Sequence, residues 1–172
     1  MRVTDKYILF YTEWPSNFAK ANFTWTAFNE THNFFCTEQA YHWAKAMYFH
    51  DNNAVKEILS TEAEGNTPMW CKQCGRWTEG YIEEEWAKVR YEFMFQVNIA
   101  KYTQNENLKK KLLNPEYDDK IFVEASPTDK IWGIGRAVDD PKADDEKHWH
   151  GTNLLGKCLT DVRKALLLSK EN

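Results

Sequence analysis

One stretch of the chain, TEQAYHWAKAMYFH from Thr37 to His50, combines a carboxylate, an imidazole and an amine at helical spacing. Side chains on a helix project at intervals of about 100°, which places on one face Glu38, Tyr41, His42 and Lys45. An amine flanked by aromatic rings loses part of its hydration, and this lowers its pKa and favours nucleophilic attack by the neutral amine. Lys45 is therefore a candidate nucleophile beside Glu38, although periodicity alone more often indicates a solvated polar face.

A second group of candidates lies in VEASPTDKIWGIG, from Val123 to Gly135. Here Glu124 ends a β-prone run, Asp129 follows a turn, and Trp132 precedes Gly133. Glycines allow a close approach of the backbone to a ligand or to another segment. The pattern lacks the strand and the spacing of a phosphate loop, so a tight turn is the alternative.

The run Trp70–Cys74, WCKQC, has the spacing of a redox dithiol. No βαβ pattern precedes it, and Cys71 and Cys74 supply only two ligands for zinc. The thiols that could complete such a site, Cys36 and Cys158, match no compact zinc module. We therefore expect no metal, no cofactor and ordinary thiols in a loop over residues 65–75, with a redox or zinc protein as the alternative.

Hydrophobic periodicity predicts the elements that would position these groups. We expect strands over residues 7–12, 23–28 and 121–125, and helices over residues 37–50, 51–60, 82–97 and onward, 105–113 and 153–166. Thr37 and Asn153 are the expected N-caps of their helices, and Ile82 is expected to face inward. The fold class that follows is α+β and predominantly α-helical, a single compact domain over residues 1–172 with a few short strands.

Composition limits the possible functions. The chain has 172 residues, with 22 Lys and Arg against 26 Asp and Glu, and a net charge of −4, so we expect no stable general binding to nucleic acids. No apolar run approaches the roughly 18 residues of a membrane span, and the start is too polar for a signal peptide. With four dispersed cysteines, these features predict an intracellular protein of the cytoplasm or nucleus, with no membrane association.

Six short motifs occur in the same order as in the NADAR, or YbiA-like, family. They are PSNF at 15–18, TEQAYHWAKA at 37–46, GRW at 75–77, W-x-x-x-R at 86–90, V-E-A-S-x-x-D-x-x-W-G at 123–133 and W-x-G-x-N-L-L-G at 149–156. The resemblance extends from Phe10 to Leu167. It implies a compact, mainly helical fold with one pocket that holds a ribose between acidic and aromatic groups.

The resemblance also implies roles for individual residues. Lys45 matches the lysine that forms a Schiff base with the opened ribose, with Glu38 and Asp129 as the other catalytic residues. The remaining matching positions are expected to bind the substrate: Ser16, Asn17, Phe18, Tyr41, His42, Trp86, Trp132, Gly133 and Asn153. A scheme with two carboxylates, Glu38 with Asp129 or Glu124, remains the alternative.

The function expected from the resemblance is that of an N-glycosidase, a monomer that removes ADP-ribose from a modified nucleobase such as guanine, in DNA or in a nucleotide. Two alternatives remain open. One is cleavage of phosphoribosylated intermediates of riboflavin synthesis, and the other is a non-catalytic module that binds ADP-ribose. The run around Cys71 and Cys74 and the acidic loop over residues 139–148 depart from the simplest members, and leave the choice of substrate open.

Overall fold

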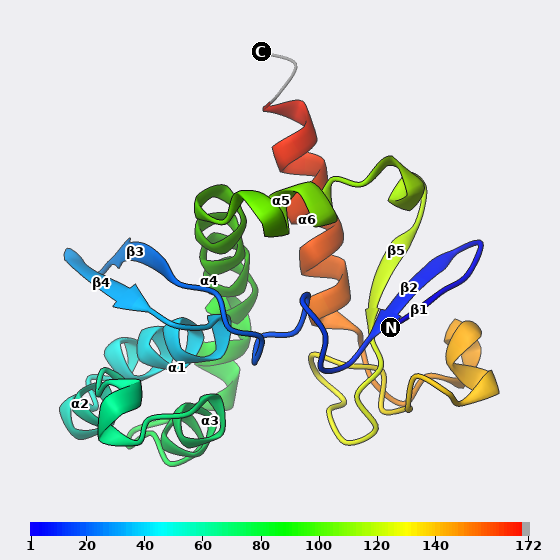
Figure 1. Ribbon diagram of the computed structural model, residues 1–172. Coiled ribbons are helices and arrows are strands. Elements are labelled where there is room, and N and C mark those ends of the chain that lie inside the picture. Colours follow the sequence, from blue (N-terminus) through cyan, green and yellow to red (C-terminus); the bar gives the residue numbers. More distant parts are fainter. Residues whose placement is uncertain (170–172) are drawn as a thin grey trace. The chain divides into compact units, whose positions relative to one another are not determined.

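The structure is a computed structural model that describes residues 1–169. The described residues form two compact units, the first comprising residues 1–16 and 106–169 and the second Asn17–Asn105. Helices predominate and the strands are short (Figure 1), which confirms the predicted fold class. The second unit is inserted between two strands of the first unit that pair in parallel, an arrangement that requires a long connection.

The second unit is built around one helix. Helices α2 (Asn52–Ile58), α3 (Pro68–Arg76) and α4 (Glu83–Gln104) all pack against α1 (Thr37–Tyr48) (Figure 1). Strands β3 (Phe23–Ala27) and β4 (Glu30–Phe34) form an antiparallel hairpin that packs on α4 and α1. Its two turn residues, Phe28 and Asn29, have φ of 52° and 61°, as a tight hairpin turn requires.

Both faces of α1 are covered. Its residues from Thr37 to Ala46 are all buried, and Trp43, which is fully buried, meets Trp25 of the hairpin edge to face at 5.6 Å. Glu38 is 6% and Lys45 8% exposed. The alternative of a solvated polar face is therefore wrong, because α1 is enclosed by other elements of its unit.

The first unit contains a small sheet and the C-terminal helix. Strand β1 (Arg2–Val3) pairs antiparallel with β2 (Tyr7–Phe10), which pairs in parallel with β5 (Ile121–Glu124), in register from Tyr7↔Ile121 to Phe10↔Glu124. Helix α6 (Leu154–Leu168) packs against β5, and α5 (Glu106–Leu112) precedes the sheet's last strand (Figure 1). Short 3-10 turns occur in the second unit at Glu62–Glu64, and in the first at Pro115–Tyr117, Pro141–Asp144 and Glu146–His148.

The expected loop over residues 65–75 is wrong, because residues 68–76 form α3. The side chain of Thr67 accepts the N–H of Trp70 at 3.1 Å, and Pro68 occupies the first turn. Proline needs no N–H donor at this position and its φ suits a helix start. The sequence pattern predicts a loop around Pro68, whereas in the structure this residue begins a helix.

Two expectations at helix starts also need correction, and a third is confirmed in its position. Cys36 is the N-cap of α1, and Thr37 is its first helical residue. Ile82 is the N-cap of α4 and is 54% exposed, so it does not face inward. Asn153 is the N-cap of α6 by position, but its side chain makes no cap hydrogen bond. Periodicity locates a helix more reliably than its terminal residues.

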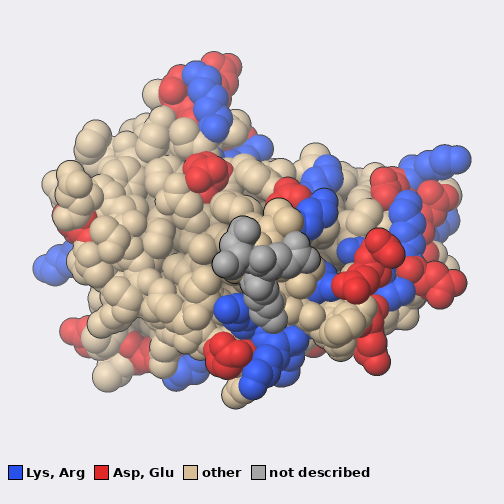
Figure 2. Space-filling view, turned by 90° about the horizontal axis from the view of Figure 1, so that it is seen from above, with Lys and Arg blue, Asp and Glu red and all other residues tan. Residues whose placement is uncertain are grey.

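No helix among residues 1–169 is long and apolar enough to cross a membrane. On the molecular face drawn in Figure 2, basic and acidic side chains are interspersed, and no continuous basic surface is visible. This distribution agrees with the small net charge of −4.

Candidate active site

The second unit brings Glu38 and His42 into direct contact. They are four residues apart on α1, and Nε2 of His42 lies 3.0 Å from Oε1 of Glu38, with both side chains buried. The backbone carbonyl of Asn17 accepts the N–H of Glu38 at 3.0 Å, so the PSNF segment is attached to the first turn of α1. The Glu38 carboxylate is thus held in one position by its own helix.

Helix α3 packs against the imidazole ring of His42. A Cβ at Gly75 would lie 1.8 Å from Nδ1 of His42 and 2.5 Å from Cγ. Only glycine has room at this contact. In the sequence, the GRW motif is the only feature that marks this contact. A glycine in such a motif predicts a turn between elements, and it does not reveal that another side chain packs against it.

Lys45 lies one turn beyond His42, with its side chain enclosed. Its Nζ is 3.9 Å from the centre of the Tyr81 ring. Burial lowers the pKa of Lys45 to about 8, although Glu83 acts in the opposite direction. At pH 7 about one tenth of this amine is therefore unprotonated, far more than of an ordinary surface lysine.

Three residues that the sequence analysis did not select complete the surroundings of Lys45. The hydroxyl of Tyr81 donates to Glu83, and Arg90 pairs with the same carboxylate at 2.8 Å. Burial, followed by the bond to Glu83, raises the pKa of Tyr81 to about 12. The available signal was the spacing of Glu83 and Arg90, seven residues apart and so on one face of α4.

Two predicted binding residues, Tyr41 and Trp86, join α1 to α4. Nε1 of Trp86 donates to the Tyr41 hydroxyl at 2.7 Å, and both residues are almost fully buried. The Trp86 ring stacks on Phe93 at 5.5 Å. Burial raises the pKa of Tyr41. The pair therefore holds α4 against α1, the helix that carries Glu38 and Lys45.

The PSNF segment is divided between the units. Ser16 ends the first part of the first unit, and Asn17 and Phe18 begin the second. Oδ1 of Asn17 is buried and has no hydrogen-bond partner among residues 1–169. Buried acceptors are normally paired, so this oxygen is available to a ligand. Nζ of Lys72 lies 5.5 Å from the Phe18 ring centre.

The remaining predicted site residues belong to the first unit. Oδ1 of Asp129 accepts the N–H groups of Ile131 and Trp132, at 2.9 and 2.8 Å, and so shapes the turn that carries Trp132. A Cβ at Gly133 would lie 2.9 Å from the carbonyl oxygen of Glu124. This glycine therefore lets the turn pack directly on the end of β5.

Asn153 connects the start of α6 to the edge of β5. Its Oδ1 accepts the N–H of Glu124 and its Nδ2 donates to the carbonyl of Phe122, both at 2.9 Å. Gly156 packs closely behind it, since an added Cβ would lie 2.0 Å from the carbonyl oxygen of Phe122. The W-x-G-x-N-L-L-G motif thus has a clear packing role in the first unit.

The cysteines do not form a reactive centre in the described part of the chain. All four are buried and unbridged. Burial raises the pKa of Cys36 to about 12, and it also raises the pKa of Cys71 and Cys74. Within residues 1–169 no three His, Cys, Asp or Glu side chains are grouped so that they could hold a metal ion.

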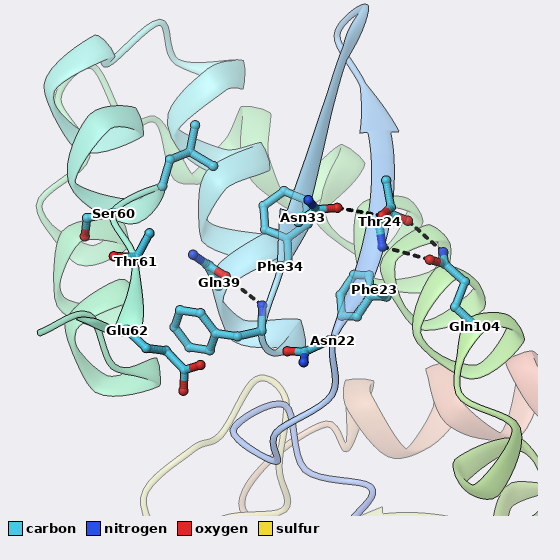
Figure 3. Close-up of a pocket in the computed structure, with 12 residues that line it drawn as sticks. Asn22, Phe23, Thr24, Asn33, Phe34, Gln39, Ser60, Thr61, Glu62 and Gln104 are labelled. Atoms are coloured by element: carbon cyan, nitrogen blue, oxygen red, sulfur yellow. Dashed lines mark hydrogen bonds between the residues drawn. The ribbon is translucent and has the colours of Figure 1, made fainter. Parts of the chain in front are cut away.

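A hollow of about 530 Å³ lies between the hairpin and the end of α2 (Figure 3). None of the predicted site residues lines it. Its two glutamines already make hydrogen bonds: Gln104 bonds both the N–H and the carbonyl of Thr24, and Gln39 accepts the N–H of Phe35 (Figure 3). These bonds cap the edge of β3 and the start of α1, so we assign the hollow a structural role.

Comparison with known proteins identifies the family. Residues 4–167 match the NADAR domain. The chain belongs to the NADAR domain family. It is 34% identical over 140 residues to protein irg-1 of Caenorhabditis elegans, an alignment that covers 80% of this chain and 63% of irg-1. It therefore spans less than two thirds of that relative's length.

Two further similar proteins cover nearly the whole chain. The chain is 32% identical to N-glycosidase R617 of Acanthamoeba polyphaga mimivirus, over 94% of this chain and 96% of R617. The NMR structure of YbiA from E. coli superimposes with a TM-score of 0.72 at 24% identity, covering 99% of this chain and 90% of YbiA. YbiA therefore shows that the fold is the same.

Proposed function

We propose that this NADAR protein is an N-glycosidase that removes ADP-ribose from a modified nucleobase, with Lys45 as the nucleophile. The observation that carries the proposal is the Lys45 amine, 8% exposed, whose pKa burial lowers to about 8. An amine in this state is reactive towards an anomeric carbon near neutral pH. The name of the mimiviral relative, an N-glycosidase, supports the same reaction class.

The chemistry proceeds in three balanced steps. First, the lone pair of neutral Nζ bonds to C1 of the ribose, while the bond from C1 to the base breaks and its electron pair leaves with the protonated base nitrogen. Second, Nζ loses a proton and its lone pair forms a double bond to C1, while the ring oxygen leaves C1 and is protonated, which gives a protonated imine. Third, water adds to the imine carbon and the amine is expelled, which releases ADP-ribose and restores Lys45.

Glu38 is the proposed acid and base for these proton transfers. Its carboxylate is buried and held by His42 at 3.0 Å, seven residues before Lys45 and therefore on the same helix face. A fixed carboxylate in such surroundings is suited to general acid–base catalysis. We retain Asp129 as the third catalytic residue of the proposal.

The other family positions are the proposed substrate contacts. Asn17 supports this assignment because its Oδ1 is buried and unpaired among residues 1–169. The same role is proposed for Ser16, Phe18, Tyr41, His42, Trp86, Trp132, Gly133 and Asn153. We also propose that the protein is an intracellular monomer. It recognises its substrate through the ADP-ribose group.

An assay with defined substrates tests the activity. The protein is incubated with ADP-ribosylated guanosine, with an oligonucleotide carrying ADP-ribosyl guanine, and with a phosphoribosylated riboflavin precursor. Chromatography then measures the free sugar and the free base. We expect ADP-ribose from the first two. Release from the phosphoribosyl compound alone would favour the riboflavin alternative, and binding without release would favour the non-catalytic module.

A further inference from the structure

A second hollow, of about 490 Å³, lies between α2 and α3 in the second unit. None of the residues of the candidate active site lines it. Its walls are two tryptophans and three carboxylates, namely Trp70, Trp77, Asp51, Glu57 and Glu79. This is the segment around WCKQC, to which the proposed reaction gives no role.

The two tryptophans face the same space. They are seven residues apart at the two ends of α3, a spacing that puts both on one face of the helix. Their ring centres are 6.3 Å apart and their planes meet at 82°. Trp77 is 69% exposed, an unusual exposure for the largest aromatic side chain. Its ring therefore offers a face to a ligand instead of filling the core.

The carboxylates give the hollow negative charge. Asp51 accepts the N–H groups of Ala54 at 3.0 Å and of Glu79 at 2.8 Å, and these bonds hold its carboxylate in place. Glu57 and Glu79 are exposed. In the described chain none of these three carboxylates pairs with a lysine, arginine or histidine. The charge is therefore not neutralised within the protein.

A protonated thiol also lines the hollow. Cys74 is buried beside the tryptophans, and burial, followed by the charges of Glu57 and Asp51, raises its pKa. A protonated buried thiol behaves as a small apolar group. The hollow is therefore lined by an apolar thiol, two aromatic rings and three carboxylates.

We infer that this hollow binds a methylated ammonium cation. Tryptophan faces attract cations more strongly than other rings do, and aromatic walls are suited to quaternary ammonium groups, which are weakly hydrated and donate no hydrogen bonds. The three carboxylates add attraction for the positive charge without needing direct contact. The same chemistry is found in a free quaternary amine and in a trimethylated lysine of a protein.

Titration with matched small molecules tests the binding chemistry. The indole N–H signals of protein labelled with ¹⁵N at tryptophan are followed as choline is added, and separately as 3,3-dimethyl-1-butanol, its neutral isostere, is added. We expect choline to shift the signals of Trp70 and Trp77, and the neutral alcohol to bind about tenfold more weakly or not at all. Equal affinity for both compounds would overturn the inference.

Variants locate the site. Trp77→Ala and Glu57→Gln alter exposed side chains, so the fold is retained, and Trp77→Ala should weaken choline binding by about tenfold. Met69→Ala, an exposed position near the start of α3 that does not line the hollow, and Glu84→Gln, on α4, are the matched controls and should bind as the wild type does. Unchanged binding in Trp77→Ala would place the cation elsewhere and refute the site.

Peptides distinguish the two sources of the cation. A short peptide with trimethyllysine is compared with the same peptide carrying unmodified lysine, and with choline. Binding of choline with similar affinity supports a free amine as the ligand, whereas a marked preference for the methylated peptide supports a protein partner. If neither cation binds more tightly than its uncharged or unmodified counterpart, the inference fails.

Discussion

Lys45 and Lys101 show how burial changes the properties of a single residue. Both lie in the second unit, and burial lowers the pKa of each to about 8. Lys45 is next to the exposed Tyr81 ring, whereas Lys101 is completely buried within the unit. The first is therefore the one that a substrate can reach, and the second affects stability.

At the residue scale, Lys45→Ala should abolish glycosidase turnover while the fold is retained. Borohydride added during turnover of the wild-type protein should reduce the imine and add mass to the peptide that contains Lys45. Mass spectrometry after proteolysis checks this. Lys88→Ala removes an exposed lysine of α4 and should behave as the wild type does. Full activity of Lys45→Ala would refute the covalent mechanism.

The pH dependence of the reaction should reflect the same amine. Because only neutral Lys45 attacks, kcat/KM should increase with pH and level off above about pH 8, the pKa that burial produces. Replacing Glu83 by Gln removes the charge that raises the pKa of Lys45, and should move this limb to lower pH. Initial rates from pH 6 to 9.5 measure the rise of kcat/KM in the wild type and in Glu83→Gln. If Glu83→Gln leaves the pH of this rise unchanged, Lys45 is not the group that titrates.

Lys101 should make the stability depend on pH. Its pKa is about 8 in the folded protein, against 10.5 for a lysine in water, so the unfolded chain binds more protons between these values and stability increases with pH there. Relative to Lys101→Met, the wild type should gain up to about 3 kcal/mol between pH 8 and 10.5. Urea unfolding at several pH values measures the difference. Lys56→Met, at an exposed position of α2, is the control. A difference between the wild type and Lys101→Met that stays constant with pH would rule the effect out.

At the element scale, the contact of α3 with α1 depends on Gly75. Alanine in place of glycine within a helix usually stabilises it by about 1 kcal/mol. At this position the new Cβ would lie 1.8 Å from Nδ1 of His42, so Gly75→Ala should destabilise the protein and displace the imidazole from Glu38. The melting temperature and the turnover rate should both decrease, as thermal unfolding and the glycosidase assay would measure.

A double variant separates this displacement from a general effect on α3. His42→Ala removes the ring that the new methyl group would strike, so Gly75→Ala should cost much less stability in the His42→Ala background. Gln73→Ala, in the same helix, should show no such coupling. Additive losses would mean that the clash with His42 is not the cause.

At the scale of the whole molecule, the charge distribution should limit binding to unmodified DNA. The net charge is −4, and the face in Figure 2 has acidic side chains among its basic ones. Few phosphate contacts can then form, and affinity should be weak and sensitive to salt. Fluorescence anisotropy with a plain duplex at physiological salt measures this, and submicromolar binding would contradict it.

The sequence by itself determined where most elements lie along the chain. Helices α1, α4 and α6 and strands β2, β3 and β5 follow from hydrophobic spacing, because that spacing depends only on local geometry. The pattern also placed Glu38, His42 and Lys45 on one face of α1. Motif order was enough to indicate the NADAR family, which the match over residues 4–167 confirms.

Only the tertiary structure decided the environment of these side chains. A polar helix face has the same pattern whether it is solvated or enclosed, and the burial of Glu38 and Lys45 results from elements distant in the sequence, α3 and the Tyr81 segment. The same reason explains the missed α3. Pro68 can end one element or begin another, and the cap from Thr67 that selects the second outcome is a three-dimensional contact.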